Sequence, residues 1–315
     1  AGVGWRYAKE LRLLRHLLGT ASRGDPASVC REVETFGAGV LGSQPRWLKV
    51  AGGPKAAMLC AAVRGAPPGG PVLEIGTYCG FSSLRMAVAL PGVRVVSLEV
   101  DPMHVAIARS VVAIAGLTRR IRIWTGHSED LVPRLASRLL GHRPASGVDP
   151  PDAGSRHLEH LDGMCGDAFA AVFMDQRGSR YLDDLRLLEH HQLLRRGCAV
   201  VADNVLKPGA PLFAWYVAHG GAHHTQFASL LEFAMPAEDW MSASVRATPD
   251  SVPALWPSVI SDGLLQLELE ADRMRSKATA GGHGVPFEEW ATFAAKMSRG
   301  LERVDVVTTA SMIFP

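Results

Sequence analysis

The chain has 315 residues, of which 47% are hydrophobic and 20% charged, and its formal net charge is +2. These values are typical of a globular protein with a substantial core, and they exclude a wholly disordered chain. The near balance of acidic and basic residues argues against a dedicated nucleic-acid-binding protein, and the absence of eighteen uninterrupted apolar residues argues against a membrane span.

The cysteines and the first residue bear on the compartment. Five cysteines are scattered along the chain without a CxxC pair. This pattern predicts reduced thiols and a cytoplasmic location rather than a disulfide framework or a zinc site. The chain begins at Ala1 without a methionine, which indicates processing or excision from a longer chain. The sequence does not indicate an oligomeric state.

Helical patterns occupy residues 1–64. We expect helices at residues 5–18, from about Asp25, and at 54–64. In the first of these, Leu11, Leu14 and Leu18 share one helical face. The second is expected to begin at Asp25 and Pro26, because Asp is a good helix cap and Pro suits the first turn.

Short β-branched runs then alternate with helical patterns. The runs lie at 71–75, 94–99, 121–124, 170–174 and 198–202. The helical patterns lie at 81–90, 102–115, 129–140 and 181–194. Strands that alternate with helices predict an α/β fold with an open, doubly wound parallel sheet, although any single apolar run could instead be a buried helix.

Two stretches interrupt this alternation. Residues 141–166 are rich in Gly, Pro, His and Asp and predict a long loop. Residues 236–298 combine a Pro-rich segment with helical patterns at 262–277 and 286–298.

A glycine-bearing turn follows the first predicted strand. Gly76 and Gly80 are spaced as GxxxG, whereas a dinucleotide pyrophosphate calls for GxGxxG. S-adenosylmethionine has no pyrophosphate and needs close backbone approach and a carboxylate for its ribose. Gly76 can supply the close backbone approach. Glu99, at the end of the second strand, can supply the carboxylate. The alternative is that both glycines only form the turn.

Oxygen donors follow the fourth and fifth predicted strands. Asp175 ends one, and Asp203 and Asn204 end the other. Neighbouring parallel strands lie about 5 Å apart, so these side chains should meet beside the cofactor turn. Oxygen donors without His or Cys suit a hard cation, with Mg²⁺ preferred. The alternative is that each Asp caps a helix.

The motifs resemble, in order, those of the Mg²⁺-dependent catechol O-methyltransferase family from about residue 15 to 235. The segments that carry the resemblance are GDPASV (24–29), Trp47, LEIGTYCGFS (73–82), LEVDP (98–102), GHSEDLVP (126–133), MDQRGSRYLDDLRLLE (174–189), LLRRG (193–197) and ADNVLKPGAP (202–211). The resemblance implies a class I methyltransferase fold with a seven-stranded, mostly parallel sheet of order 3-2-1-4-5-7-6, and a single domain over residues 1–315.

The resemblance also implies roles for individual residues. The metal ligands would be Asp175, Asp203 and Asn204. The cofactor would contact Glu74, Gly76, Tyr78, Ser82 and Glu99 at its methionine and ribose parts, Ser128 and Gln176 at adenine, and the backbone of Ala51 at the amino-acid end. Glu232 would bind the acceptor hydroxyl that is not methylated, and Trp47 and Pro208 would wall the catechol pocket. Each of these three also has a purely structural interpretation: Trp47 could lie in the core, Pro208 could begin a helix, and Glu232 could lie at the surface.

Three positions depart from the family. The family's catalytic lysine is replaced by Gly178, an aromatic gatekeeper by Arg177, and an apolar residue near the donor methyl by Lys49. Arg177 cannot accept a proton, whereas Lys49 could if burial lowered its pKa. Because the usual base is missing, we expect a slower enzyme or one shifted to higher pH, with Lys49 as the candidate base. A solvated lysine is the alternative.

The two interrupting stretches read as insertions into the family fold. Residues 222–233 resemble the sixth strand and the loop with Glu232, and residues 300–310 resemble the seventh strand. Residues 236–298 would then lie between two paired strands, as a lid, an additional substrate wall or a peripheral subdomain. The three histidines at 142, 157 and 160 suggest no metal site.

The sequence thus favours methyl transfer from S-adenosylmethionine to one hydroxyl of a small catechol-like acceptor held on Mg²⁺. A non-catalytic binding or scaffold domain is the alternative that Gly178 favours. A nicotinamide-dependent reductase is disfavoured by the GxxxG spacing.

Overall fold

The computed structural model describes residues 6–40, 48–140, 168–235, 237–247, 260–280 and 285–309. The predicted loop at 141–166 and the predicted wall residue Trp47 lie outside these ranges. Within them, no helix is both long and apolar enough to cross a membrane.

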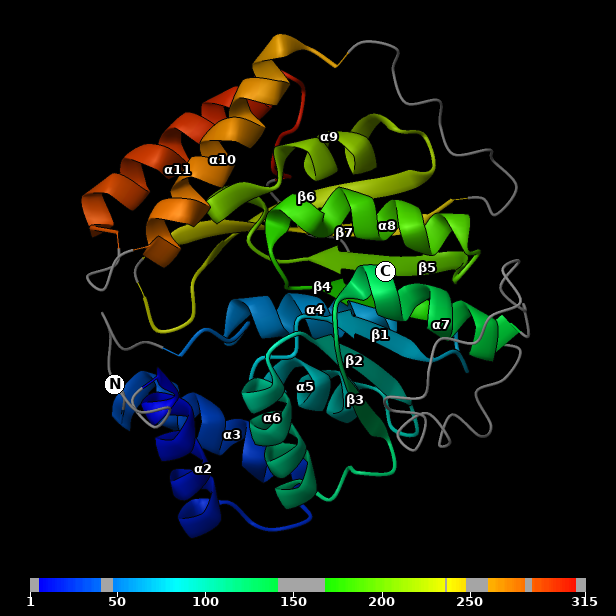
Figure 1. The fold of residues 1–315 in the computed structure, drawn as a ribbon, viewed down its shortest axis with the longest axis vertical. Coiled ribbons are helices and arrows are strands. Elements are labelled where there is room, and N and C mark those ends of the chain that lie inside the picture. The colour runs from blue at the N-terminus through cyan, green and yellow to red at the C-terminus, as the bar shows by residue number, and fades with distance from the viewer. Residues whose placement is uncertain are drawn as a thin grey trace.

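A seven-stranded sheet of order β3-β2-β1-β4-β5-β7-β6 forms the centre of the molecule, which confirms the predicted topology (Figure 1). Its strands are β1 (Val72–Ile75), β2 (Val95–Glu99), β3 (Ile121–Thr125), β4 (Phe169–Met174), β5 (Leu194–Ala202), β6 (His223–Leu231) and β7 (Glu238–Arg246). The first five are mutually parallel, while β7 pairs antiparallel with both β5 and β6. The five strands predicted between residues 71 and 202 are all present.

The register of β4 and β5 brings two predicted ligands to one edge. Met174 pairs with Ala202, so that Asp175 and Asp203 are each the next residue of two neighbouring parallel strands. On the other side of β4, Ile75 pairs with Met174, which places Gly76 beside Asp175. The carboxyl ends of β1, β4 and β5 therefore converge, as open α/β sheets require for a ligand crevice.

Helices cover both faces of the sheet. Those on one face are α2 (Ala8–Thr20), α3 (Pro26–Thr35), α4 (Pro54–Arg64), α5 (Phe81–Ala89) and α6 (Pro102–Ile114). Those on the other are α7 (Ser128–Leu140), α8 (Tyr181–His190), α9 (Pro211–His219), α10 (Asp262–Ala280) and α11 (Phe287–Glu302). The two apolar cores meet at the alternating residues of the strands, which are nearly all buried.

The N-terminal helices match their predicted positions but not every predicted face. Asp25 caps α3 by accepting from the amides of Ala27 and Ser28, as expected. In α2, however, the buried residues are Glu10, Leu13 and Leu17, whereas Leu11 and Leu18 are exposed. Both sets have helical spacing, and the buried one includes Glu10, which accepts a hydrogen bond from Tyr78 Oη at 2.7 Å.

The expected place of the seventh strand is wrong. Residues 238–246 form β7, directly after the loop that holds Glu232, while residues 300–302 end α11. The sheet is therefore complete before the described helices α10 and α11, which follow it rather than separating two paired strands. The short β6–β7 connection explains the difference, because it lets two consecutive strands form a hairpin.

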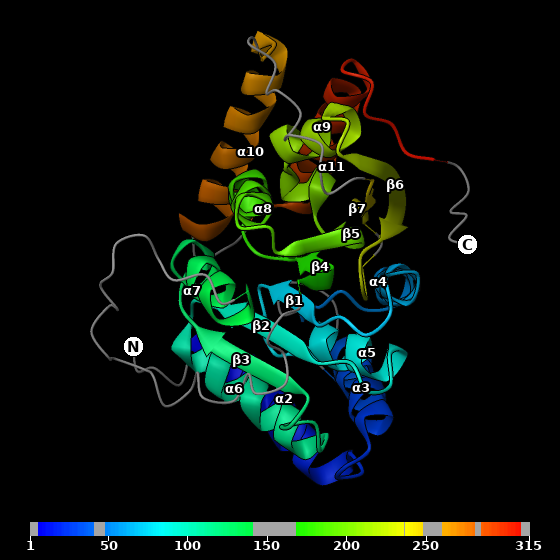
Figure 2. The ribbon, with the colours of Figure 1, turned by 90° about the vertical axis from the view of Figure 1, so that its right-hand side faces the viewer.

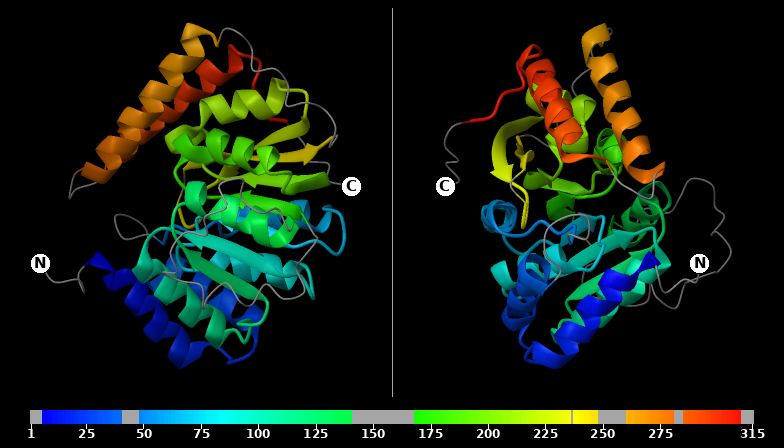
Figure 3. Two further views of the ribbon diagram at one scale, coloured as in Figure 1. Left: turned by 45° about the vertical axis from the view of Figure 1, so that its right-hand side comes forward. Right: turned by 90° about the vertical axis from the view of Figure 1, so that its left-hand side faces the viewer.

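The last two helices form an antiparallel pair at one end of the molecule. Figures 1 and 2 show α10 and α11 beside α9, and Figure 3 shows them at the opposite end from α2 and α3. Gly300 of α11 permits the close approach of the pair, since a Cβ there would lie 2.5–3.1 Å from the Leu267 side chain of α10. Both helices also contact the helical turn η4 (Val205–Gly209), which follows β5.

Candidate active site

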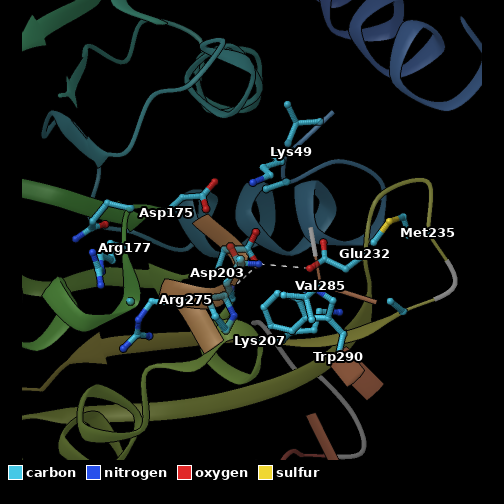
Figure 4. Close-up of a pocket in the computed structure, with 18 of the residues that line it drawn as sticks. Lys49, Asp175, Arg177, Asp203, Lys207, Glu232, Met235, Arg275, Val285 and Trp290 are labelled. Atoms are coloured by element: carbon cyan, nitrogen blue, oxygen red, sulfur yellow. Dashed lines mark hydrogen bonds between the residues drawn. The ribbon is translucent and has the colours of Figure 1, made fainter. Parts of the chain in front are cut away.

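A cavity of about 650 Å³ opens at the carboxyl ends of β4 and β5. Its walls come from the segment before α4, the turns after β1, β4 and β5, the β6–β7 loop, and helices α10 and α11 (Figure 4). Ten of the predicted site residues line it: Lys49, Ala51, Tyr78, Asp175, Gln176, Arg177, Asp203, Asn204, Pro208 and Glu232. The cavity thus brings together predicted cofactor, metal and acceptor residues from segments far apart in the sequence.

The turn after β1 requires glycine at its first position. Gly76 has φ 95°, and a Cβ there would collide with the backbone carbonyl of Asp175. A side chain is therefore excluded by both conformation and space. The space beside Gly76 is thus filled by the turn after β4, and this glycine allows the close packing of the β1 and β4 turns, as the alternative interpretation expects.

Glu74 is enclosed rather than open to the cavity. The side chain is fully buried, and its oxygens accept hydrogen bonds from the hydroxyls of Ser82, Ser83 and Ser97. Burial raises the pKa of Glu74 to about 7, against the lowering effect of the three hydroxyls. We therefore expect Glu74 to act on a cofactor by orienting Ser82, and not by direct contact as the sequence suggested.

Glu99 ends β2 and is fixed by backbone amides. One of its oxygens accepts from the amides of Thr77 and Tyr78 at 3.2 and 2.9 Å, and the other accepts from the amide of Asp101 at 2.9 Å. The carboxylate is thereby held beside the β1 turn, where the sequence analysis placed a ribose. Oε1 accepts only one of these amides, so the carboxylate retains an acceptor site for a further hydroxyl donor.

Ser128 and Gln176, the predicted adenine residues, meet at a third residue. Both donate to the buried carboxylate of Asp184 at 2.8 Å. The carbonyl oxygen of Gln176 is buried and has no hydrogen-bond partner among the described residues. Since an unsatisfied buried acceptor is costly, this oxygen is suited to the amino group of a bound adenine.

Asp175, Asp203 and Asn204 lie at adjacent strand ends, as predicted. Asp203 accepts from Lys55 Nζ at 2.6 Å and from the Asn204 amide at 2.7 Å, both through Oδ1. Asn204 adopts the left-handed conformation, φ 54°, which Asn tolerates better than most residues. Its side-chain amide donates to Asp239 at 2.8 Å, which leaves its carbonyl oxygen available as a ligand.

A single buried lysine forms ion pairs with three carboxylates next to the cavity. Lys55 Nζ, at the start of α4, lies 2.6 Å from Asp203, 3.1 Å from Glu232 and 3.1 Å from Asp239. Surrounded by acids, its pKa is raised well above the ordinary value despite complete burial. Lys55 is fully buried and is not among the residues that line the cavity, and it occupies one oxygen of the candidate ligand Asp203.

The remaining negative charge fits a divalent cation. Asp175 has no ion-pair or hydrogen-bond partner for its side chain among the described residues, and burial together with the nearby Asp203 carboxylate raises its pKa well above the ordinary value. Burial also raises the pKa of Asp203, and the positive charge of Lys55 partly offsets this rise. Two carboxylates and an amide oxygen are the donors that Mg²⁺ prefers. No group of three or more His, Cys, Asp or Glu side chains suited to a metal occurs in the described ranges, and this set contains only two.

Glu232 lies on the acceptor side of these groups. Its Oε2 lies 3.1 Å from Lys55 Nζ, and its Oε1 accepts from Asn204 Nδ2 at 3.4 Å. Burial raises the pKa of Glu232 to about 7, although Lys55 lowers it. Near neutral pH the carboxylate can therefore either accept or donate a proton to a hydroxyl in the cavity.

Lys49 points into the cavity from the segment before α4. Figure 4 shows its amino group directed toward Asp175. Desolvation and the neighbouring Lys9 lower its pKa, while Glu10 raises it. The residue is exposed, as the solvated alternative predicts, and its amine has no ion-pair or hydrogen-bond partner within the described part of the chain. The lowered pKa favours the neutral amine that a general base requires.

Position 178 has no room for the lysine that the family carries there. A Cβ on Gly178 would lie 2.6 Å from the carbonyl oxygen of Gly209 and 3.1 Å from Nη1 of Arg275. Arg275, from α10, donates to that same carbonyl and is paired with Glu268 and Asp272 at 2.8 and 3.0 Å. Arg177, beside it, is exposed and reaches Asp272 at 3.8 Å.

Four functional residues were missed: Lys55, Asp184, Asp239 and Arg275. For two of them a signal was available, because Lys55 and Asp184 are charged residues on the apolar faces of their helices. Asp239 was assigned to an insertion, although it is fully buried and accepts from the amides of Lys207 and Trp240. Arg275 acts through tertiary contacts that helical spacing does not reveal.

Similarity to known proteins agrees with this arrangement. Residues 62–138 match the sequence model of an O-methyltransferase family. The catechol O-methyltransferase of Mus musculus is 35% identical over 247 residues, which cover 78% of this chain and 81% of that protein. The catechol O-methyltransferase of Bos taurus is 33% identical over 228 residues, 72% of each chain.

A solved structure matches the fold. The O-methyltransferase from Bacillus cereus, in complex with SAH, aligns with a TM-score of 0.50 at 20% identity over 70% of this chain and 90% of that one. At this identity the likeness concerns the fold alone.

Proposed function

This chain belongs to the catechol O-methyltransferase family, and from that premise we propose that it transfers the methyl group of S-adenosylmethionine to one hydroxyl of a catechol-type acceptor held on Mg²⁺. The observation that carries the proposal is the convergence of Asp175, Asp203 and Asn204 at adjacent strand ends, beside the glycine turn and inside one cavity with Glu232.

The cofactor would occupy the part of the cavity next to β1. Gly76 allows the β1 turn to pack against the β4 turn beside this space, the Glu99 carboxylate can accept a ribose hydroxyl through Oε1, and the unpartnered oxygen of Gln176 can accept from the adenine amino group. The Bacillus cereus enzyme of similar fold was solved with SAH, the product of such a transfer.

The metal would be held by Asp175, Asp203 and the carbonyl oxygen of Asn204. When bound, Mg²⁺ supplies a Lewis acid that lowers the pKa of coordinated hydroxyls. Lys55 and Asp239 keep this set in place, because Lys55 neutralises one oxygen of Asp203 and Asp239 fixes the amide of Asn204. These supporting contacts correspond to the outer partners that orient ligands in other metal sites.

The acceptor would lie with one hydroxyl on Glu232 and the other facing Lys49. S-adenosylmethionine would supply a methyl group whose transfer to the latter oxygen breaks the carbon–sulfur bond and leaves a neutral thioether, and the Lys49 amine would take the hydroxyl proton. General-base help of this kind contributes about 10²–10⁴-fold, and positioning accounts for much of the remaining acceleration.

The test is the transfer itself. Purified protein, S-adenosylmethionine with a labelled methyl group, Mg²⁺ and catechol should yield the labelled monomethyl ether, identified by mass spectrometry. Cofactor binding without any labelled ether, across pH 6.5–9, would contradict the proposal.

A further inference from the structure

We propose that α10 and α11 form a fixed second wall of the acceptor pocket, and that the acceptor is a catechol with an extended, planar apolar substituent that packs against Trp290 and Phe287. This inference rests on the proposed function and adds the acceptor class to it.

The apolar side chains at this end of the cavity are incompletely covered by protein. Phe287 begins α11 and is 46% exposed, and Trp290, one turn later, is only partly buried. Both line the cavity together with Val285, Met235 and Ala278. Aromatic and aliphatic groups gathered at one end of a cavity are typical of sites that bind an apolar part of a ligand.

The wall is anchored to η4 and to the start of α9. Arg275 donates to the carbonyl of Gly209, and Glu268 accepts from the amide of Leu212 at 3.3 Å. Gly209 has no side chain that would separate η4 from α11, and a Cβ there would lie 3.2 Å from Met297. Since η4 follows Asn204 directly, the aromatic wall keeps a fixed distance from the residues that would bind the acceptor hydroxyls.

The polar groups of this wall are already satisfied. The Arg275 guanidinium is paired with Glu268 and Asp272, and the Thr279 hydroxyl donates to the carbonyl of Arg275. Lys207 Nζ donates to the carbonyl of Glu238 at 3.0 Å. An anionic substituent would have to compete with Glu268 and Asp272 for the Arg275 guanidinium, so a neutral apolar group fits best beside α10 and α11.

Figure 4 shows how the two ends are arranged. Asp175, Asp203 and Lys49 lie on one side of the cavity, and Trp290, Val285 and Met235 lie on the side of Glu232. A ring whose hydroxyls face Glu232 and Lys49 would therefore direct a substituent toward the aromatic pair.

The experiment compares catechol with 4-phenylcatechol as acceptors for the full chain, with saturating S-adenosylmethionine and Mg²⁺. For the wild type we expect kcat/KM to be about tenfold to 100-fold higher for 4-phenylcatechol, the range that a well-filled apolar pocket gives. Phe287→Ala and Trp290→Ala should remove this preference, by lowering kcat/KM for 4-phenylcatechol to about the value for catechol. Leu269→Ala, which truncates an exposed residue of α10 outside the cavity, should keep it.

The outcomes separate the two proposals. A wild type that methylates both acceptors equally well would overturn the aromatic wall and leave the methyl transfer intact, whereas a wild type that methylates neither would remove both. Proportional loss with both acceptors in Phe287→Ala would also overturn the wall. Because Phe287 is half exposed, its truncation should not affect folding, and an unchanged melting temperature checks this even if Trp290→Ala is unstable.

Discussion

Arg275 stands beside the place where a side chain on Gly178 would project. Its Nη1 lies 3.1 Å from the position of a Cβ at residue 178, and it donates to the Gly209 carbonyl that lies 2.6 Å from the same point. No positive φ requires glycine there. The absence of the family's lysine is therefore linked to the docking of α10, whose arginine now borders that part of the site.

Introducing the family's lysine at position 178 should therefore lower stability and activity. Gly178→Lys or Gly178→Ala must displace η4 or α10, at a cost of about 1–3 kcal/mol of stability, and we expect kcat/KM for the acceptor to fall with it. Thermal unfolding and steady-state kinetics measure both effects. Gly19→Ala is the control, since its Cβ would meet open space near the end of α2, and it should be neutral or stabilising. A Gly178→Lys variant with higher activity than the wild type would refute this account.

Lys49 should govern the pH dependence of transfer. Lys49→Met is expected to lower kcat at neutral pH by about 10²–10⁴-fold, with a smaller deficit at high pH, where acceptor hydroxyls ionise without help. Lys9→Met should shift the wild-type profile upward in pH, because Lys9 is one of the groups that lower the pKa of Lys49. Profiles of kcat from pH 6.5 to 9 are the measurement. Equal rates for Lys49→Met and the wild type at pH 7 would exclude Lys49 as the base.

Lys55 should be a major contributor to folding. Lys55→Met leaves Asp203, Glu232 and Asp239 without their common cation, and breaking a buried ion pair in this way costs about 3–5 kcal/mol. The matched control is Lys296→Met, which breaks a solvent-exposed pair with Glu270 and should change stability by at most about 1 kcal/mol. Denaturant unfolding distinguishes them, and equal losses in the two variants would show that the buried cluster is not stabilised by Lys55.

Part of the fold and of the candidate site could be predicted from the sequence. The first five strands, the helices between them and the convergence of Asp175 with Asp203 followed from periodicity and from the rule that parallel strands present their carboxyl ends together, whereas the strand order followed from the resemblance to the family. The seventh strand was misplaced because β7 carries buried Asp239 and few of the β-branched residues that mark a strand, whereas residues 300–310 carry more of them. The contact of Arg275 with Gly209 depends on two segments 66 residues apart, and no local pattern indicates such a pairing.

Glu232 should make stability depend on pH. Its pKa is about 7 in the folded protein against an ordinary value of 4.5, so the folded state binds more protons between these pH values. The stability that this group contributes is complete below pH 4.5 and is lost as the pH rises through about 7. Without metal, Glu232→Gln should therefore gain stability relative to the wild type from pH 5 to 8, as measured by denaturant unfolding in EDTA. Glu288→Gln, at the start of α11, is the control. A difference that stays constant with pH would show that Glu232 titrates normally.

The most direct test of the account is the Mg²⁺ dependence of methyl transfer to catechol in the wild type and in Asp175→Asn, with the exposed Asp183→Asn as the matched control. We predict that EDTA abolishes transfer in the wild type and in Asp183→Asn, that Mg²⁺ restores it with saturation, and that Asp175→Asn needs at least about tenfold more Mg²⁺ or stays inactive. Transfer that continues undiminished in EDTA, or an Asp175→Asn titration that coincides with that of Asp183→Asn, would contradict the account.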